Sequence, residues 1–257
     1  MTAWQLCAFL LCVAVATGAQ SITGFAMALI LLGLCGLLDV APLAEVANVA
    51  TVLSLVSAAV ALRSSRRSID WPMLRMTGSG SVIGVALGVF LLAWLQSNIV
   101  MVLRLLLGVT VVACALVVLF RAEPLARRSP GWTFGLFGAL SGVLGGLFSA
   151  SGPPLVYQYY RQPLELESLR DTLVAALAVS SALRLSLVVA SGQFSARAMG
   201  LCAVATPLAA AITWWMRRHP PPWPRRAVLV LVCALLLATG AGLIVPSVRS
   251  LARTIGG

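Results

Sequence analysis

The chain has 257 residues, of which 60% are hydrophobic and 10% charged, and its mean hydropathy is +1.01. Its formal net charge of +11 comes from 18 arginines, with no lysine, and most of them stand in short segments between apolar runs. That placement is typical of residues that orient membrane helices and argues against nucleic-acid binding. The composition excludes a soluble globular domain and predicts a polytopic membrane protein.

Uncharged segments long enough to cross a bilayer occur along the whole chain. The first runs from Met1 to Leu38, which is longer than the apolar region of a signal peptide. A membrane helix needs about 20 apolar residues, so the chain has room for about eight hydrophobic segments. Ordinary transmembrane helices are predicted at 42–62, 73–95, 99–120, 166–190, 196–216 and 226–246.

Two further segments, 3–38 and 131–160, are too long for one crossing and contain small and polar residues. The first is interrupted at 20–25, with the sequence QSITGF, and the second at 149–154, with the sequence SASGPP. Proline suits the first turn of a helix, where its missing N–H leaves no hydrogen bond unmade. Each segment is therefore predicted to break inside the membrane, where irregular backbone must be buried in protein or line a cavity.

Each broken segment precedes three ordinary helices. The chain therefore consists of two repeats with the same order of elements. We assign repeat one to 3–120 and repeat two to 131–246, within a single membrane domain, 1–257. Weak internal repeats of this kind are common in transporters.

The distribution of arginine distinguishes two topologies. If each broken segment crosses the membrane once, the repeats are parallel and 10 arginines fall on one side against 7 on the other. If each is a hairpin that returns to its starting side, the split is 13 to 4, with Arg184 inside the membrane. The positive-inside rule favours the second topology. It predicts both termini outside the cytoplasm and an all-α fold of two inverted repeats, each a broken or re-entrant segment plus three transmembrane helices.

The second break has the features of an anion site. A helix that starts at Gly152 would direct free N–H groups and the positive end of its dipole toward the break. The first break offers a weaker version of the same arrangement. Small residues at these positions could instead serve only close helix packing, and that alternative stays open.

Polar residues inside the ordinary helices are candidates for the wall of a cavity. Asn48 and Thr51 are three residues apart, close to one face of a helix. Arg184 is intramembrane, which is costly and marks a functional candidate, although its side chain could instead snorkel to the interface. The predicted substrate-binding residues are Gln20, Ser21, Thr23, Gly24, Asn48, Thr51, Ser149, Ser151, Gly152, Pro153 and Arg184.

The glycine pattern at 138–146 (GALSGVLGG), followed by 151–156 (SGPPLV), resembles the second-repeat motif of the sulfite exporter (TauE/SafE-type) permease family. The stretch 20–25 is similar to its first-repeat counterpart, as is Ile69-Asp70-Trp71 after a basic loop. The resemblance implies transport of small anions, often sulfur-containing or organic acids. Many members carry three glycines before the proline, where this chain has 149–151 as Ser-Ala-Ser, and this difference leaves the identity of the anion open.

The sequence therefore predicts a secondary transporter, a permease or exporter of small anions, that works by alternating access in the bacterial inner membrane. An accessory membrane protein without transport activity and an anion channel are the alternatives. Enzyme motifs are absent, and the six cysteines form no CxxC pair, so neither catalysis nor a cofactor or metal is expected. The expected partners are a small anion and the lipid bilayer, with a homodimer left open.

Overall fold

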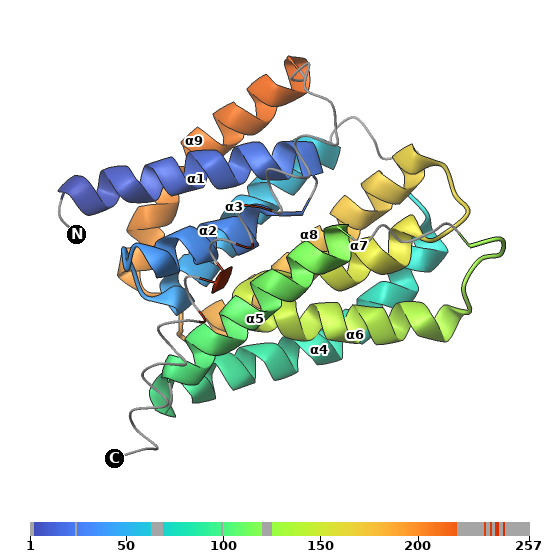
Figure 1. Cartoon of the computed structure of the whole chain (residues 1–257), viewed down its shortest axis with the longest axis horizontal. Helices are drawn as coiled ribbons and strands as arrows, with labels where there is room; N and C mark the ends of the chain where they lie inside the picture. Colours follow the sequence, from blue (N-terminus) through green and yellow to red (C-terminus); the bar gives the residue numbers. More distant parts are fainter. Residues whose placement is uncertain are drawn as a thin grey trace.

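The computed structural model describes residues 3–23, 25–62, 69–98, 100–119 and 125–219, with the isolated positions 234, 237, 240, 241 and 244. Within these residues it consists of helices joined by short connections, without a strand (Figure 1). The helices are α1 (Ala3–Thr23), α2 (Met27–Leu37), α3 (Leu43–Leu62), α4 (Trp71–Asn98), α5 (Val100–Leu119), α6 (Gly131–Phe148), α7 (Gly152–Tyr160), α8 (Leu166–Ala190) and α9 (Ala196–Arg218). The helix predicted at 226–246 lies largely outside the described residues.

The all-α membrane fold predicted from the sequence is confirmed. Six of the described helices, α1, α3, α4, α6, α8 and α9, are long and apolar enough to cross a bilayer. Their outer surfaces are apolar as well: on α4, Ile83 is 64% exposed and Phe90 is 72% exposed. Such surfaces are unfavourable in water and suit contact with lipid chains. The predicted helices at 42–62, 73–95, 99–120, 166–190 and 196–216 correspond to α3, α4, α5, α8 and α9.

Both broken segments double back on themselves, as Figure 1 shows. In the first, the thiol of Cys12 on α1 lies beside that of Cys35 on α2. In the second, the ring of Phe134, near the start of α6, is 6.3 Å from that of Tyr159, near the end of α7. In each segment, a residue far before the break contacts a residue far after it. The two helices on either side of the break must therefore be antiparallel. With nine residues, α7 is about 13 Å long, roughly half the thickness of the hydrocarbon layer.

The helix ends gather in two groups at opposite ends of the molecule. Ser57 and Thr213 bring the C-terminal halves of α3 and α9 together, with their hydroxyl oxygens 3.4 Å apart. A Cβ atom on Gly18, late in α1, would lie 3.8 Å from the sulfur of Met216 near the end of α9. The helices α4, α6 and α8 begin at this same end, where the Asp70 N–H donates to the Thr172 hydroxyl.

We call this the arginine-rich end, because the chain positions there include Arg75, Arg127, Arg128, Arg161, Arg170 and Arg218. The other end carries the junction of α8 and α9, with Arg197 paired to Glu45 at 3.4 Å. Helix α1 runs toward the arginine-rich end and α6 runs away from it (Figure 1). Opposite directions of the two hairpins are what the inverted-repeat interpretation requires.

The closest helix pair is α4 with α6, and glycine makes it possible. A Cβ atom on Gly84 would lie 2.9 Å from the Cα of Gly142, and one on Gly88 would lie 2.9 Å from the Cα of Gly146. Helix backbones approach this closely only where side chains are absent, as small residues allow in membranes. The glycines of α6 before the break therefore serve close helix packing, which is the alternative that the sequence left open for small residues.

Helix α2 lies in the centre of the main core. Nine of its 11 residues are buried, and Leu29, Ile30, Leu31 and Leu32 are 1% exposed or less. A helix that is apolar on every side is stable only when surrounded by protein or lipid. It packs against α1 and α3, and less extensively against α5 and α6. This burial holds the first break, just before α2, in the interior.

Candidate functional site between the two breaks

The two chain breaks lie against each other in the protein interior. A Cβ atom on Gly152, the first residue of α7, would stand 2.7 Å from the Cβ of Phe25, the residue between α1 and α2. Phe25 is 7% exposed, so its ring cannot swing away into open space. Glycine is therefore needed at 152 for the breaks to meet. The sequence placed the substrate site between these two breaks.

A cavity lies at this junction. Its empty space is about 390 Å³, including the mouth that opens to solvent. Four predicted site residues line it, together with residues of α3 and α8. Three of the four offer a hydroxyl or amide side chain, and Gly152 offers only its backbone. The lining consists of Gln20, Phe25, Ser54, Ala58, Ser149, Ser151, Gly152, Val174, Leu177 and Ser181.

A second cavity continues from the first. Gln20, Ala58 and Val174 line both of them. The second is bounded by Ser57 and Thr213 as well, and these two residues stand on the halves of α3 and α9 that lead to the arginine-rich end. The second cavity therefore adjoins the first on the side of the arginine-rich end.

Ser149 forms the turn of the second break in an uncommon conformation. It caps α6 with φ +56° and ψ +20°, the left-handed region that glycine adopts without strain. Its N–H donates to Gly145 O at 2.8 Å, and its side-chain oxygen accepts from the Thr51 hydroxyl at 3.0 Å. A serine held in this region costs about 1 kcal/mol or more. Such strain persists where the surroundings enforce it, and here the hydroxyl faces the candidate site.

The start of α7 offers fewer donors than the sequence interpretation assumed. Four N–H groups are free at a helix start, but Pro153 and Pro154 stand in the first turn of α7 and have none. The N–H groups of Ser151 and Gly152 remain as donors at the break. Pro153 itself is buried and is not among the residues that line the cavity. The Ser151 carbonyl is held by the Ser141 hydroxyl.

Arg184 is buried beside this site at 1% exposure, so the snorkelling alternative for it is wrong. Its Nε donates to Gly146 O at 3.0 Å. Its Nη1 donates to the Thr51 hydroxyl at 2.6 Å, to Asn48 Oδ1 at 3.0 Å and to Ala47 O at 3.3 Å. Among the described residues, Nη2 has no hydrogen-bond partner and no carboxylate pairs with the guanidinium. The acceptors are all neutral oxygens, so the positive charge is not compensated there.

A continuous chain of hydrogen bonds leads from the cavity through Arg184 to the far end of the molecule. Ser149, which lines the cavity, is within hydrogen-bond distance of the Thr51 hydroxyl, whose single proton it shares with Ala47 O at 2.8 Å. The Thr51 oxygen accepts from Arg184. Arg184 also donates to Asn48, whose side-chain N–H donates to Gln193 O at 3.1 Å. Gln193 stands in the exposed connection between α8 and α9. These five residues, Ser149, Thr51, Arg184, Asn48 and Gln193, are called the polar chain below.

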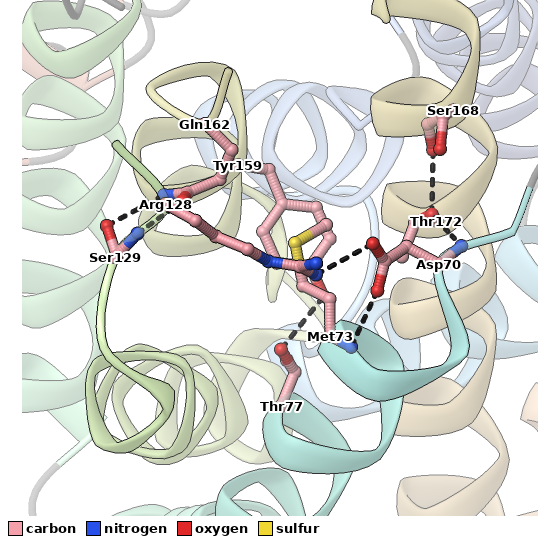
Figure 2. A network of polar contacts seen from close by, with 9 residues as sticks. All are labelled: Asp70, Met73, Thr77, Arg128, Ser129, Tyr159, Gln162, Ser168 and Thr172. Carbon is pink, nitrogen blue, oxygen red and sulfur yellow. Dashed lines mark hydrogen bonds and ion pairs between the residues drawn. The ribbon is translucent and has the colours of Figure 1, made fainter. Parts of the chain in front are cut away.

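At the arginine-rich end, a second polar network holds the start of α4 (Figure 2). One carboxylate oxygen of Asp70 accepts from the Met73 N–H at 2.9 Å and so caps the helix. The other accepts from Arg128 at 2.7 Å. Since the Asp70 N–H also reaches Thr172 on α8, this residue ties α4 to α8 and to the segment before α6.

The same network holds the C-terminal end of α7. The Tyr159 hydroxyl donates to the Thr77 hydroxyl on α4 at 2.9 Å. Gln162 accepts from the Ser129 N–H at 2.9 Å and donates to the Ser129 hydroxyl at 3.0 Å. Figure 2 shows these side chains converging from α4, α7 and the segment before α6. Helix α7 is thus fixed at one end, while its other end borders the cavity.

Comparison with known proteins agrees with this architecture. The family model described as sulfite exporter TauE/SafE matches residues 9–239. The chain belongs to the TauE/SafE family. It is 33% identical, over 231 residues, to a protein of Cupriavidus necator named "Probable sulfite/organosulfonate exporter TauE", and the match covers 90% of each chain. No solved structure matches the chain.

Membership of this family makes the chain a membrane transporter rather than an enzyme. The match begins inside α1 and includes both breaks and every residue of the polar chain. A multi-pass protein of the bacterial inner membrane, as expected from the sequence, agrees with an exporter that has six candidate spans among its described helices.

The predicted site residues other than Pro153 fall into four groups. Gln20, Ser149, Ser151 and Gly152 line the cavity, whereas Asn48, Thr51 and Arg184 lie behind it in the polar chain. Ser21 lines only the second cavity and donates to Thr17 O within its own helix at 2.9 Å. The side chain of Thr23 and the whole of Gly24 lie outside the described residues.

Sequence reasoning did not find the carbonyl acceptors Gly146 O and Gln193 O. A backbone carbonyl is present at every position and carries no sequence signal, so only the fold can select these two. It also did not name Ala58, which lines both cavities, because an alanine in an apolar helix has no distinguishing chemistry.

Proposed function

We propose that this chain exports small oxyanions, sulfite or short organosulfonates and related acids, and that the substrate binds between the two chain breaks. The observation that carries the proposal is the cavity at the junction of the breaks, with hydroxyl and amide groups in its wall and an uncompensated buried arginine behind Ser149. The name of the Cupriavidus necator relative supports the substrate class.

The electrostatics of the cavity support an anion over a cation. The lining contains no acidic residue. The N-terminal end of α7 contributes the positive end of its dipole, and the N–H groups of Ser151 and Gly152 are available as donors. Arg184 adds a full positive charge two hydrogen bonds away from Ser149. Hydrogen bonds from such donors to an anion are about twice as strong as those between neutral groups.

Alternating access is supported by the unequal closure of the two sides. The cavities lead toward the arginine-rich end, which the positive-inside rule assigns to the cytoplasm. On the other side, the buried side chains of the polar chain occupy the space between the cavity and the exposed connection of α8 and α9. We therefore propose that the structure is an inward-facing state, from which an exporter loads its substrate. Inverted repeats of this type supply the matching outward-facing state in other transporters.

The test is flux of sulfite and short sulfonates in proteoliposomes that contain the purified chain. Wild-type flux should saturate with substrate concentration. Ser151→Ala should lower the apparent affinity about tenfold, because a hydrogen bond to a charged ligand contributes about 1.5–3 kcal/mol. The control is Ser186→Ala, an exposed serine of α8 that bonds only within its own helix. Unchanged affinity in a combined Ser151→Ala and Thr23→Ala variant would place the substrate site elsewhere.

The two alternative functions are outcomes of the same measurement. Flux that does not saturate would indicate an anion channel on this scaffold, and absence of flux with every oxyanion would indicate an accessory protein. The homodimer also stays a prediction, to be checked by the mass of the purified particle.

A further inference from the structure

We propose that Arg184 is the outer gate of this transporter and that the substrate anion opens it by replacing the protein oxygens that now hold the guanidinium. This inference rests on the proposed export function. It adds to that function a side chain that moves during transport, a binding position for the anion beyond the cavity, and a restriction on the anion's shape.

The gate is assigned from the way Arg184 connects three helices. From α8 it donates to Gly146 O on α6 through Nε, and to Thr51 and Asn48 on α3 through Nη1. Any movement that separates α3 from α6 on this side must break one set of these bonds. Arg184 therefore lies where an outward-facing state would have to open.

The free-energy balance at Arg184 favours an arriving anion. A buried charge is costly unless it is paired and its hydrogen-bonding groups are filled. Nη2 has no partner among the described residues, and the bonds of the other nitrogens go to neutral oxygens. An oxyanion would supply the opposite charge and an acceptor for Nη2 together. Once it does so, the bonds that join α8 to α3 are no longer needed to stabilise the guanidinium.

The substrate has a short route to this position. Thr51 accepts from Arg184, and its hydroxyl proton is shared between Ala47 O and the Ser149 hydroxyl. Ser149 borders the cavity. An anion at Ser149 can take over the Thr51 hydroxyl as its own donor and so break the link between the second break and the gate. The next group along the polar chain is the guanidinium itself.

The geometry of a guanidinium restricts the substrate. Its planar fork pairs with two oxygens on one centre, which sulfite, sulfonates and carboxylates possess and chloride does not. We therefore expect oxyanions to open the gate and chloride at the same concentration to leave it closed.

The competing explanation is that Arg184 only fastens three helices together. The two roles differ in whether the cavity becomes reachable from outside when substrate binds. Ala58→Cys provides the reporter, because Ala58 lines both cavities and alanine to cysteine is a small change. The reporter is labelled with a membrane-impermeant thiol reagent added to vesicles of either orientation. The chain without this substitution measures labelling of the native cysteines.

With Arg184 in place, the reporter should be labelled from the arginine-rich side alone, and sulfite should increase labelling from the opposite side at least tenfold. Chloride should have no such effect. In Arg184→Gln the opposite side should label without sulfite, because the gate cannot close. Arg184→Lys keeps the charge but loses the fork, so its sulfite-dependent labelling and its flux should both fall at least tenfold.

A third variant protects the test against loss of folding in the Arg184 variants. Thr51→Val keeps the volume of the side chain and leaves Arg184 its bonds to α6 and to Asn48. It should remain closed but lose the response of labelling to sulfite. The gate would be overturned if wild-type, Arg184→Gln and Thr51→Val proteins were labelled equally from the outside, both without sulfite and with it. If wild-type protein moves no anion at all, the export function itself is wrong, which is a separate result.

Discussion

Ser149 shows how one residue can serve the site at a cost to the fold. Its left-handed backbone suits glycine, and many relatives have glycines here, as the resemblance implies. The serine hydroxyl reaches Thr51 and so joins the break to Arg184. Strained residues cluster at functional sites because the surrounding structure can hold them. The chain thus has a polar group where glycine would leave none.

Substitution of Ser149 should separate stability from binding. Ser149→Gly and Ser149→Ala both lose the hydroxyl, but only glycine relieves the left-handed strain, so the glycine variant should be more stable by about 1 kcal/mol. Both should bind sulfite more weakly than the wild-type chain. Thermal unfolding in detergent, with and without sulfite, measures the two effects. Equal stability of the two variants would show that the backbone at 149 is not strained.

At the level of residues, polar side chains inside membrane helices could be identified from the sequence. The contacts that these side chains make with one another could not. Arg184, Asn48 and Thr51 were identified because polar groups are costly in lipid. Their mutual contacts depend on the pairing of α3 with α8, which no local pattern specifies. The donor set at α7 was overestimated, although the two prolines were visible in the sequence.

Among the elements, the α4–α6 pair depends on glycine at defined positions. Gly84→Ala would bring a Cβ to 2.9 Å from the Cα of Gly142 and closer still to Ala139 O. Because backbone cannot yield as a side chain can, we expect a loss of about 1–3 kcal/mol, the usual cost of overpacking. The control is Gly78→Ala on the same helix, where nothing lies within 4 Å and alanine should stabilise by about 0.5–1 kcal/mol.

Unfolding in denaturant or by heat would give the difference between these two alanine variants. If Gly84→Ala and Gly78→Ala change the free energy of unfolding by the same amount, α4 and α6 do not pack as closely as described.

Helix α7 should depend on its anchor at the arginine-rich end. Tyr159→Phe removes the bond to Thr77, whose side chain is fully buried. An unfilled buried hydroxyl costs about 1–3 kcal/mol, so stability should fall by about that amount. Adding Thr77→Val to the Tyr159→Phe protein should recover part of the lost stability, because no buried hydroxyl then remains without a partner. A double-mutant cycle measures this coupling, and additive losses would argue against the bond.

The existence of the helices was predictable because each is a long apolar run bounded by charge or proline. The ends of α8 agree with the prediction of 166–190, and α3 begins one residue later than expected. The breaks were predictable from small residues and prolines. The burial of α2 on all sides was not, because an apolar helix of 11 residues has the same composition whether lipid or protein surrounds it.

For the whole molecule, the topology provides the sharpest test. We expect the arginine-rich end to face the cytoplasm and both termini to lie outside it, because the charge split of 13 to 4 follows the positive-inside rule. Reporter fusions at Arg127 and at the C-terminus should report opposite sides of the membrane. A cytoplasmic C-terminus would rule out the inverted arrangement. Arg66, in the other loop assigned to the cytoplasm, lies outside the described residues.

The central position of α2 has a consequence for how the protein is made. This helix is synthesised early, yet it packs against α5 and α6 as well as α1 and α3, and α6 leaves the ribosome much later. At 11 residues it is also too short to cross the bilayer alone. Until α6 arrives, α2 must be shielded by lipid or by the insertion machinery. A nascent chain halted before α6 should therefore be degraded rapidly, and the first repeat expressed alone should not reach a stable state.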